Sequence, residues 1–258
     1  MTGPAAPLRF AAVGDLHCTE ASAGTLRPLF VQAAAAADAL LLCGDLTDYG
    51  TPQEARVLAD ELGAVRMPVV AVLGNHDFES GAADEVRRIL HGAGVQLLDG
   101  EATEVLGVGI AGAKGFAGGF GRAALGAWGE PAIKAFVHEA LQEALKLEAA
   151  LAKLRTPHRI ALLHYAPIID TVQGEPAEIF AFLGSARLEE PLLRHPVDFV
   201  VHGHAHRGSL EGRTVNGVPV YNVARPLLQQ CFADRPAFRV LHIGGDGRGD
   251  GAAAAAVP

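Results

Sequence analysis

Five short stretches of the chain are almost continuously apolar, and each is followed directly by polar residues. They are rich in Ala, Val and Leu and span residues 8–13, 39–43, 69–73, 159–163 and 197–201. Apolar runs of this length are typical of β-strands that are covered on both faces, as in parallel sheets. We therefore predict a buried strand at each stretch.

Helical patterns separate the first strands from one another. Residues 23–37, 52–62 and 82–90 have helical spacing of apolar positions, and Thr51 followed by Pro52 is a typical helix start. The alternation of strands and helices predicts an α/β sheet. Shorter strand-like pieces follow after residue 96, at 104–111, 213–215, 218–221 and 237–243. The pair Asn216-Gly217 predicts a hairpin turn between two of them.

Residues 112–155 interrupt this pattern. The first half is rich in glycine and contains Phe116, Phe120 and Trp128, and the second half, from Pro131, has helical spacing. Two interpretations stay open: an ordinary surface loop and helix, which we slightly favour, or a lid whose aromatic side chains cover the substrate. We expect three parts of the chain: a flexible N-terminus (1–7), a single domain containing this insertion (8–243) and a disordered tail (244–258).

Composition narrows the classes of function. Half of the 258 residues are hydrophobic, which is ample for one large domain, and the net charge is −8. That charge, with no run of Lys or Arg, argues against an extended nucleic-acid-binding face but leaves a small nucleotide open as substrate. The three scattered cysteines (Cys18, Cys43 and Cys231) indicate a reducing compartment. With no signal-peptide pattern and no apolar run long enough for a bilayer, we expect a cytoplasmic protein.

Each predicted strand is followed by side chains that can bind a metal ion. In chain order these are Asp15 and His17; Asp45 and Asp48; Asn75, His76 and Asp77; His164; and His202, His204 and His206. In open α/β sheets, ligands bind beyond the carboxyl ends of the strands. We therefore expect these side chains to meet in one crevice.

Taken together, these motifs resemble the signature of the calcineurin-like metallophosphoesterases. That signature is Asp-x-His, Gly-Asp-x-x-Asp, Gly-Asn-His-Asp/Glu, a lone His and Gly-His-x-His. Every element is present, at residues 15–17, 44–48, 74–77, 164 and 203–206. The resemblance covers roughly residues 8–243 and implies a four-layer αββα sandwich with a dinuclear metal centre at one edge.

The resemblance also implies the metal ligands. Asp15, His17 and His206 would hold one ion, Asn75, His164 and His204 the other, and Asp45 would bridge both. Two divalent cations need anionic ligands, which the carboxylates provide, and the mixed oxygen and nitrogen donors suit several metals. We favour Mn or Fe, with Zn, Ni and Co as alternatives. His202 lies outside the motif, and we interpret it as a supporting or packing residue.

The neighbours of these ligands have further predicted roles. By resemblance, His76 is the catalytic histidine that contacts the phosphate and helps the leaving group depart, and Asp48 orients it. We interpret Asp77 as a turn or cap residue. Tyr165 and Arg225 are candidates for contact with the substrate, since arginine pairs well with phosphate.

These expectations point to a phosphoric ester hydrolase with a metal-bridging hydroxide. A phosphodiesterase acting on a small phosphoester, with a nucleotide among the candidates, is our first hypothesis, because the short Gly-Asp-Leu-Thr-Asp form resembles the small bacterial phosphodiesterases of the family. A phosphomonoesterase, either a nucleotide or a protein phosphatase, is the alternative. A non-catalytic scaffold on the same fold is less favoured, because every ligand position is filled. The oligomeric state is left open.

Overall fold

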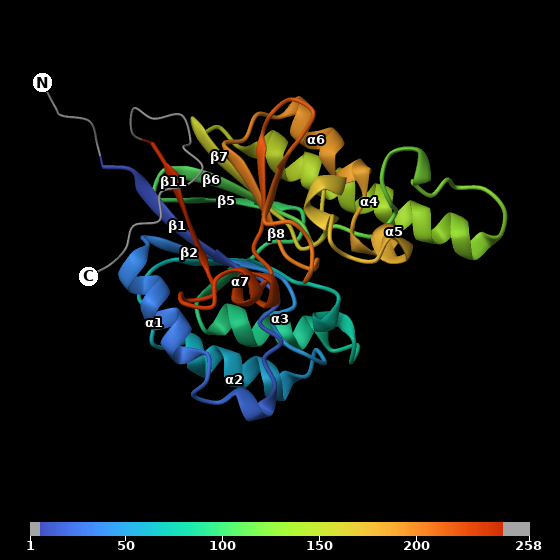
Figure 1. Cartoon of the computed structure of the whole chain (residues 1–258). Helices are drawn as coiled ribbons and strands as arrows, with labels where there is room; N and C mark the ends of the chain where they lie inside the picture. Colours follow the sequence, from blue (N-terminus) through green and yellow to red (C-terminus); the bar gives the residue numbers. More distant parts are fainter. Residues whose placement is uncertain (1–5, 245–258) are drawn as a thin grey trace, which may run out of the picture.

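Two stacked β-sheets form the centre of the computed structural model, which describes residues 6–244 (Figure 1). The strand order is β11-β1-β2-β3-β4 in the first sheet and β5-β6-β7-β8-β10-β9 in the second. The strands are β1 (Leu8–Val13), β2 (Ala39–Cys43), β3 (Val69–Val72), β4 (Val95–Leu97), β5 (Glu101–Val105), β6 (Val108–Gly112), β7 (His158–Leu162), β8 (Phe199–His202), β9 (Glu211–Arg213), β10 (Pro219–Asn222) and β11 (Arg239–Ile243).

Helices cover the outer face of each sheet. The helices are α1 (Arg27–Ala36), α2 (Pro52–Leu62), α3 (Ala83–Gly92), α4 (Pro131–Lys153), α5 (Phe180–Leu183), α6 (Glu189–Arg194) and α7 (Arg225–Cys231). The first three pack on the first sheet, and α4 and α6 pack on the second. The predicted fold class, an αββα sandwich, is therefore confirmed. None of the helices within residues 6–244 is both long and apolar enough to cross a membrane.

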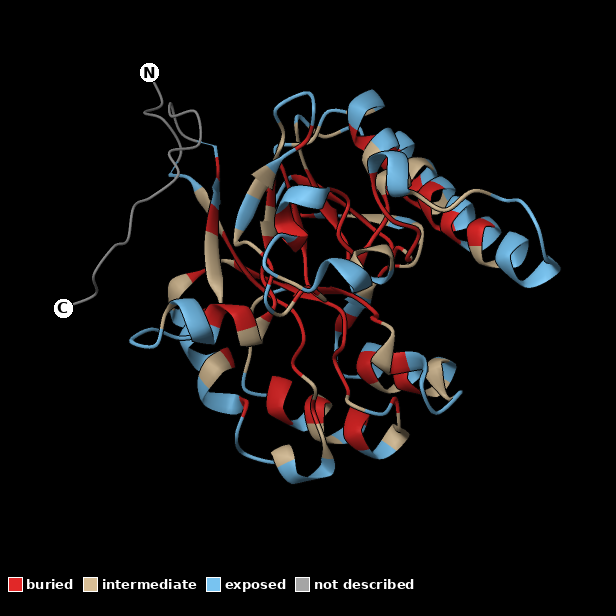
Figure 2. Cartoon of the chain, turned by 45° about the vertical axis from the view of Figure 1, so that its right-hand side comes forward, coloured by how far each residue is buried: buried red, intermediate tan, exposed pale blue. Residues whose placement is uncertain are grey.

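The layering explains the continuous apolar runs. Along β2, Leu41 and Cys43 face the central core between the sheets, whereas Leu40 and Leu42 pack towards the outer helices. All residues of this strand are buried, so neither face tolerates polar side chains. Figure 2 shows that the helices, in contrast, are buried mainly on one face and exposed on the other.

Parallel pairing brings the motif-bearing strand ends to one edge. β1, β2 and β3 are parallel to one another, and so are β6, β7 and β8. The predicted bounds of β1, β2 and α2 agree with the structure, and Thr51 caps α2 by accepting from the Glu54 N–H. The Asn216-Gly217 turn is also confirmed, because β9 and β10 pair in antiparallel fashion around it.

One predicted strand is wrong. Residues 104–111 contain two strands, because Leu106 and Gly107 both adopt positive φ (55° and 81°) and reverse the chain into an antiparallel hairpin. No Asn-Gly or Asp-Gly pair marks this turn, so the sequence pattern continues through it.

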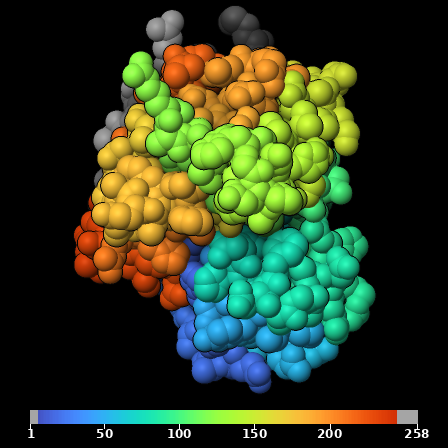
Figure 3. All heavy atoms as spheres, turned by 90° about the vertical axis from the view of Figure 1, so that its right-hand side faces the viewer, coloured from blue at the N-terminus to red at the C-terminus, as the bar shows by residue number. Residues whose placement is uncertain are grey.

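The glycine-rich part of the insertion is packed, not free. Phe120 is buried in a small core with Leu183 and Ala205, and the backbone N–H of Gly118 donates to Ala181. Figure 3 shows this lime-green segment lying against the amber segment that carries Leu183. Trp128, in contrast, is 77% exposed. These contacts favour the surface-loop interpretation over a lid. The predicted N-terminus and tail fall mostly on residues 1–5 and 245–258, outside the described residues.

Candidate metal centre

The strand ends deliver every predicted ligand to one site. Asp15 follows β1, Asp45 follows β2, Asn75 follows β3, His164 follows β7 and His204 follows β8. His17 and His206 lie two residues farther along their loops. These side chains form two groups that share the edge of the sandwich.

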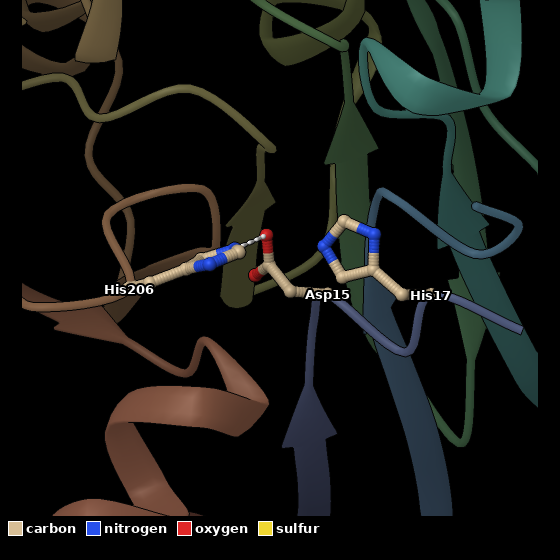
Figure 4. A group of neighbouring side chains, drawn as sticks. All are labelled: Asp15, His17 and His206. Atoms are coloured by element: carbon tan, nitrogen blue, oxygen red, sulfur yellow. Dashed lines mark hydrogen bonds and ion pairs between the residues drawn. The ribbon is translucent and has the colours of Figure 1, made fainter. Parts of the chain in front are cut away.

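The first group is Asp15, His17 and His206. Their ligand atoms lie within 4.8 Å of one another, and Figure 4 shows the Asp15 carboxylate between the two imidazoles. His206 Nε2 is 3.0 Å from Asp15 Oδ1. Burial acts to raise the pKa of Asp15, but the hydrogen bond from His206 and the electrostatic interactions with the His164 and His206 imidazoles outweigh it, so the pKa is lowered. The carboxylate is therefore ionised at neutral pH.

The second group contains Asp45, His164 and His204, whose ligand atoms again lie within 4.8 Å of one another. Asn75 joins them, because its Oδ1 lies 3.0 Å from His164 Nε2. Burial lowers the pKa of both imidazoles to about 4. Both are therefore neutral at pH 7, the form in which histidine binds a metal.

Asp45 links the two groups. Its Oδ2 is 3.9 Å from His17 Nε2, and its Oδ1 is 3.4 Å from His164 Nε2. Burial and the negative charge of Asp15 raise the pKa of Asp45. Two buried carboxylates side by side are unfavourable without positive charge, and cations between the groups would supply it.

Hydrogen bonds fix which ring nitrogen faces the centre in His17, His164 and His204. His17 Nδ1 donates to Asp48 Oδ1 at 2.9 Å, and His204 Nε2 donates to the Phe182 carbonyl at 3.1 Å. This leaves His17 Nε2 and His204 Nδ1 with free lone pairs. Among the described residues, His17 Nε2 is the one buried polar side-chain atom without a hydrogen-bond partner. A buried nitrogen acceptor that lies beside carboxylates and has no hydrogen-bond partner is typical of a metal ligand.

The same reasoning holds at His164. Its Nδ1 donates to the Cys43 carbonyl at 2.9 Å, so its Nε2 carries a lone pair in the neutral ring. That lone pair points at another acceptor, Asn75 Oδ1. A cation would turn this repulsive contact into two coordinate bonds. The residues of both groups therefore fit divalent metal ions.

Backbone strain is concentrated at the candidate ligands. Within residues 6–244, the non-glycine residues with positive φ are Asp15 (56°), His17 (45°), Asp45 (47°), His204 (69°) and Leu106 (55°). All but Leu106 belong to the two groups. Such strain is uncommon outside glycine and persists where the surrounding structure enforces it, typically at functional sites.

Asp77 has a larger role than the turn or cap interpretation gave it. It is fully buried, and its carboxylate accepts hydrogen bonds from the backbone N–H groups of Leu46, Thr47 and Gly74 and from the Thr47 hydroxyl. It thus joins the loop after β2 to the loop after β3. Leu46 and Thr47 lie about 30 residues earlier in the sequence, in the loop after β2, so no local sequence signal identifies them as partners.

His76 lies at the open side of the site. Its Nδ1 donates to the backbone carbonyl of Asp48 at 2.6 Å, and its side chain is 40% exposed. The Asp48 carboxylate is 3.7 Å from His76 Nδ1 but 2.9 Å from His17 Nδ1. The carboxylate of Asp48 thus accepts a hydrogen bond from His17, and its backbone carbonyl accepts one from His76. His76 also lies close enough to His17 and Asp45 to form a third potential ligand group.

Tyr165 and Arg225 contact different parts of this centre. The Tyr165 ring is 4.4 Å from the His204 ring and 5.3 Å from the His164 ring, between centroids. Arg225 Nη1 donates to the Leu16 carbonyl at 3.3 Å, which supports the loop that carries Asp15. The structure therefore places Tyr165 against two ligand imidazoles and Arg225 against the loop that carries Asp15 and His17.

His202 belongs to none of the potential ligand groups among the described residues. It is buried, its Nδ1 donates to the Gly203 carbonyl, and its Nε2 accepts from the Thr171 hydroxyl, each at 2.8 Å. Both nitrogens are therefore occupied, as expected for a packing residue. Sequence reasoning missed Thr171 and the Phe182 carbonyl, because neither belongs to a motif.

Comparison with known proteins agrees with this geometry. A family model described as calcineurin-like phosphoesterase matches residues 8–208. No curated protein matches the chain. Among solved structures, the phosphopantetheinyl hydrolase from Mycobacterium tuberculosis is 16% identical, with 92% of this chain and 96% of that chain covered and a TM-score of 0.66.

Two other solved structures are similar. TT1561 of Thermus thermophilus is 14% identical, with 92% of this chain and 99% of that chain covered and a TM-score of 0.54. GAP50, the anchor in the inner membrane complex of Plasmodium, is 15% identical, with 86% of this chain and 73% of that chain covered and a TM-score of 0.54. At these identities the similarities show the shared fold alone.

Proposed function

Because the chain belongs to the calcineurin-like phosphoesterase family, we propose that it is a dinuclear-metal phosphodiesterase acting on small phosphoesters. Family membership confirms the resemblance drawn from the motifs and the prediction of a metal-dependent phosphoric ester hydrolase. The observation that best supports two metals is the position of Asp45, whose two oxygens face different ligand groups.

We assign one ion to Asp15, His17 and His206, the other to Asn75, His164 and His204, and the bridge to Asp45. When bound, two divalent cations supply Lewis acidity that activates water and neutralises phosphate oxygens. The chain contributes the rest. Its hydrogen bonds keep the imidazoles of His17, His164 and His204 in a single tautomer, and its packing excludes bulk water from Asp15 and Asp45. Mn and Fe remain our favoured metals.

His76 is our candidate for the proton donor. Its Nδ1 donates to the Asp48 carbonyl, so Nε2 is the nitrogen free to meet a leaving-group oxygen at the open side of the site, and it carries a proton to donate in the imidazolium form of the ring. A positioned acid of this kind typically accelerates such a step by about 10²–10⁴-fold. Asp48 would act on His76 through its backbone, and on the metal site through His17.

Two alternatives are kept. A phosphomonoesterase would use the same ligands, and the preference for diesters rests on the short motif at residues 44–48. A non-catalytic role is the other alternative, since GAP50 is described as an anchor and shares the fold. The strained, hydrogen-bonded ligand set favours an enzyme, because a scaffold has no need for that strain.

All three cysteines are free, which supports a cytoplasmic location.

A hydrolysis screen tests this proposal. Metal-stripped protein is supplied with Mn²⁺, Fe²⁺, Zn²⁺, Ni²⁺ or Mg²⁺ and offered nucleotide monoesters, cyclic and linear diesters and a phosphopantetheinyl diester. The last is included because one structural neighbour is a phosphopantetheinyl hydrolase. We expect Mn²⁺ or Fe²⁺ to restore hydrolysis, with diesters cleaved faster than monoesters. Tight binding of two ions without hydrolysis of any ester would favour the scaffold instead.

A further inference from the structure

A partly buried lysine lies beside the metal centre in the loop after β6. The backbone carbonyl of Lys114 accepts hydrogen bonds from the N–H groups of His164 and Tyr165, both at 3.1 Å, so the loop is attached to a metal-ligand segment. The ammonium Nζ lies over three aromatic rings. Its distance to the ring centroid is 4.9 Å for Phe116, 5.3 Å for Tyr165 and 5.7 Å for Phe78.

The hydrogen bonding of this ammonium is incomplete. Nζ donates to the Gly115 carbonyl at 2.8 Å, and within residues 6–244 it forms no ion pair. Lys146 differs, because it pairs with both Asp99 and Glu143. The buried Glu143 carboxylate is already engaged by Lys146 and by the Gly115 N–H. Lys114 therefore keeps donors free, and burial lowers its pKa.

The position of Lys114 points to the substrate. Tyr165 contacts both the ammonium and the His204 ring, the latter at 4.4 Å. Phe78 ends the 3-10 turn His76–Phe78 and is 42% exposed. The aromatic cage formed by Phe78, Phe116 and Tyr165 is therefore open to solvent on the side of the candidate proton donor, His76. The ammonium thus lies one aromatic ring away from the candidate ligand His204, and it also contacts the turn that carries the candidate proton donor His76.

We propose that Lys114 binds a second phosphate group of the substrate, next to the phosphate that is cleaved. This inference rests on the proposed function. The cleaved phosphate would be neutralised by the cations held by the two ligand groups, whereas a neighbouring phosphate needs a separate cation. A compact ammonium is suited to phosphate, and the aromatic rings stabilise the cation while the subsite is empty. The enzyme would therefore prefer diphosphate-containing esters.

Calorimetry on metal-loaded full-length protein tests the subsite. The probes are methylenediphosphonate and methylphosphonate, which carry two and one phosphoryl groups and resist hydrolysis. Lys114→Met should weaken diphosphonate binding by about 10- to 100-fold and methylphosphonate binding by less than about threefold, as expected from one lost charged hydrogen bond. Lys114→Arg should recover much of the loss. Lys134→Met, an exposed lysine of α4, is the matched control and should change neither probe.

Equal weakening of both probes, or no weakening of either, would overturn the subsite. Metal content and thermal unfolding are measured on the same samples, and Lys114→Gln replaces Lys114→Met if the latter does not fold. Hydrolysis is assayed separately. A parent protein that cleaves no ester while Lys114→Met still loses diphosphonate binding would refute the proposed function and support the subsite. Cleavage with identical binding in both proteins would refute the subsite alone.

Discussion

Replacement of Asp77 by Asn tests whether the two motif loops are held together by one buried carboxylate. One oxygen of Asp77 accepts from the Thr47 N–H and hydroxyl, at 2.8 and 2.6 Å, and the other accepts from the N–H groups of Leu46 and Gly74, at 3.2 and 2.8 Å. Asparagine has the same shape but only one oxygen. Its amide NH₂ must therefore face donors that the carboxylate satisfied.

The expected loss follows from these contacts. The better orientation of the introduced asparagine would place its NH₂ beside Thr47, whose hydroxyl can turn to accept, and would leave the Thr47 N–H unpaired. An unpaired buried N–H, together with the weaker bonds to a neutral group, costs about 2–4 kcal/mol. Burial and the charge of Asp45 raise the pKa of Asp77, so removing its charge returns part of the loss, and we expect the lower half of that range. For a chain of this size, that lowers Tm by about 5–10 °C.

Thermal unfolding of the metal-free proteins measures the effect without a contribution from bound ions. The control is Asp84→Asn, an exposed residue in the first turn of α3, which removes the same charge without a buried partner. We also expect Asp77→Asn to bind metal more weakly, because Asp45 and Asn75 lie on the loops it joins. Equal Tm values for the two variants would refute the reasoning.

Three further predictions follow from the site. His76→Ala should retain both metals yet lose kcat by about 10²–10⁴-fold on alkyl or ribose esters and much less on nitrophenyl esters; equal losses would exclude a proton donor. Asp48→Ala should weaken metal binding through His17 by about 10- to 100-fold without that dependence on the leaving group, and a leaving-group effect like that of His76→Ala would contradict it. Burial lowers the pKa of His164, His202 and His204 from 6.5 to about 4, so the unfolded chain takes up these protons first. The Tm of metal-free protein should therefore fall as the pH falls from 6.5 towards 4, opposed in part by Asp45 and Asp77, whose raised pKa values let the folded chain take up their protons first. The proton of His206, whose pKa Asp15 raises, is gained mainly above this interval. A Tm that rises as the pH falls from 6.5 towards 4 would contradict the assignment.

Sequence patterns predicted those elements whose bounds are set by the burial or the capping of their own residues. β2 could be bounded because both its faces are buried, so its apolar run starts and ends with the strand. The start of α2 could be predicted because Thr51 and Pro52 are a cap and a first-turn residue. The Leu106-Gly107 turn could not, because leucine rarely adopts positive φ and nothing adjacent signals that the tertiary structure enforces it.

The site shows the same division. The ligand positions could be proposed from the sequence, because strand ends and motif spacing are visible in it. The hydrogen bonds that set their tautomers could not, because the Cys43 and Phe182 carbonyls are backbone atoms that any residue could supply. The cage around Lys114 was missed for a related reason. Its rings come from separate loops, and only the packed structure brings Phe78 and Tyr165 to the same ammonium.

Metal content of an Asp45 variant tests the central claim, a carboxylate shared by two ions, most directly. Parent, Asp15→Asn and Asp45→Asn proteins are loaded with Mn²⁺, dialysed against increasing chelator and analysed for metal per chain. Because Asp45 faces both ligand groups and Asp15 belongs to one, we expect the parent to hold two ions. Asp15→Asn should lose one of them first, and Asp45→Asn should lose both together. An Asp45→Asn protein that retains two ions as tightly as the parent would contradict the bridged centre.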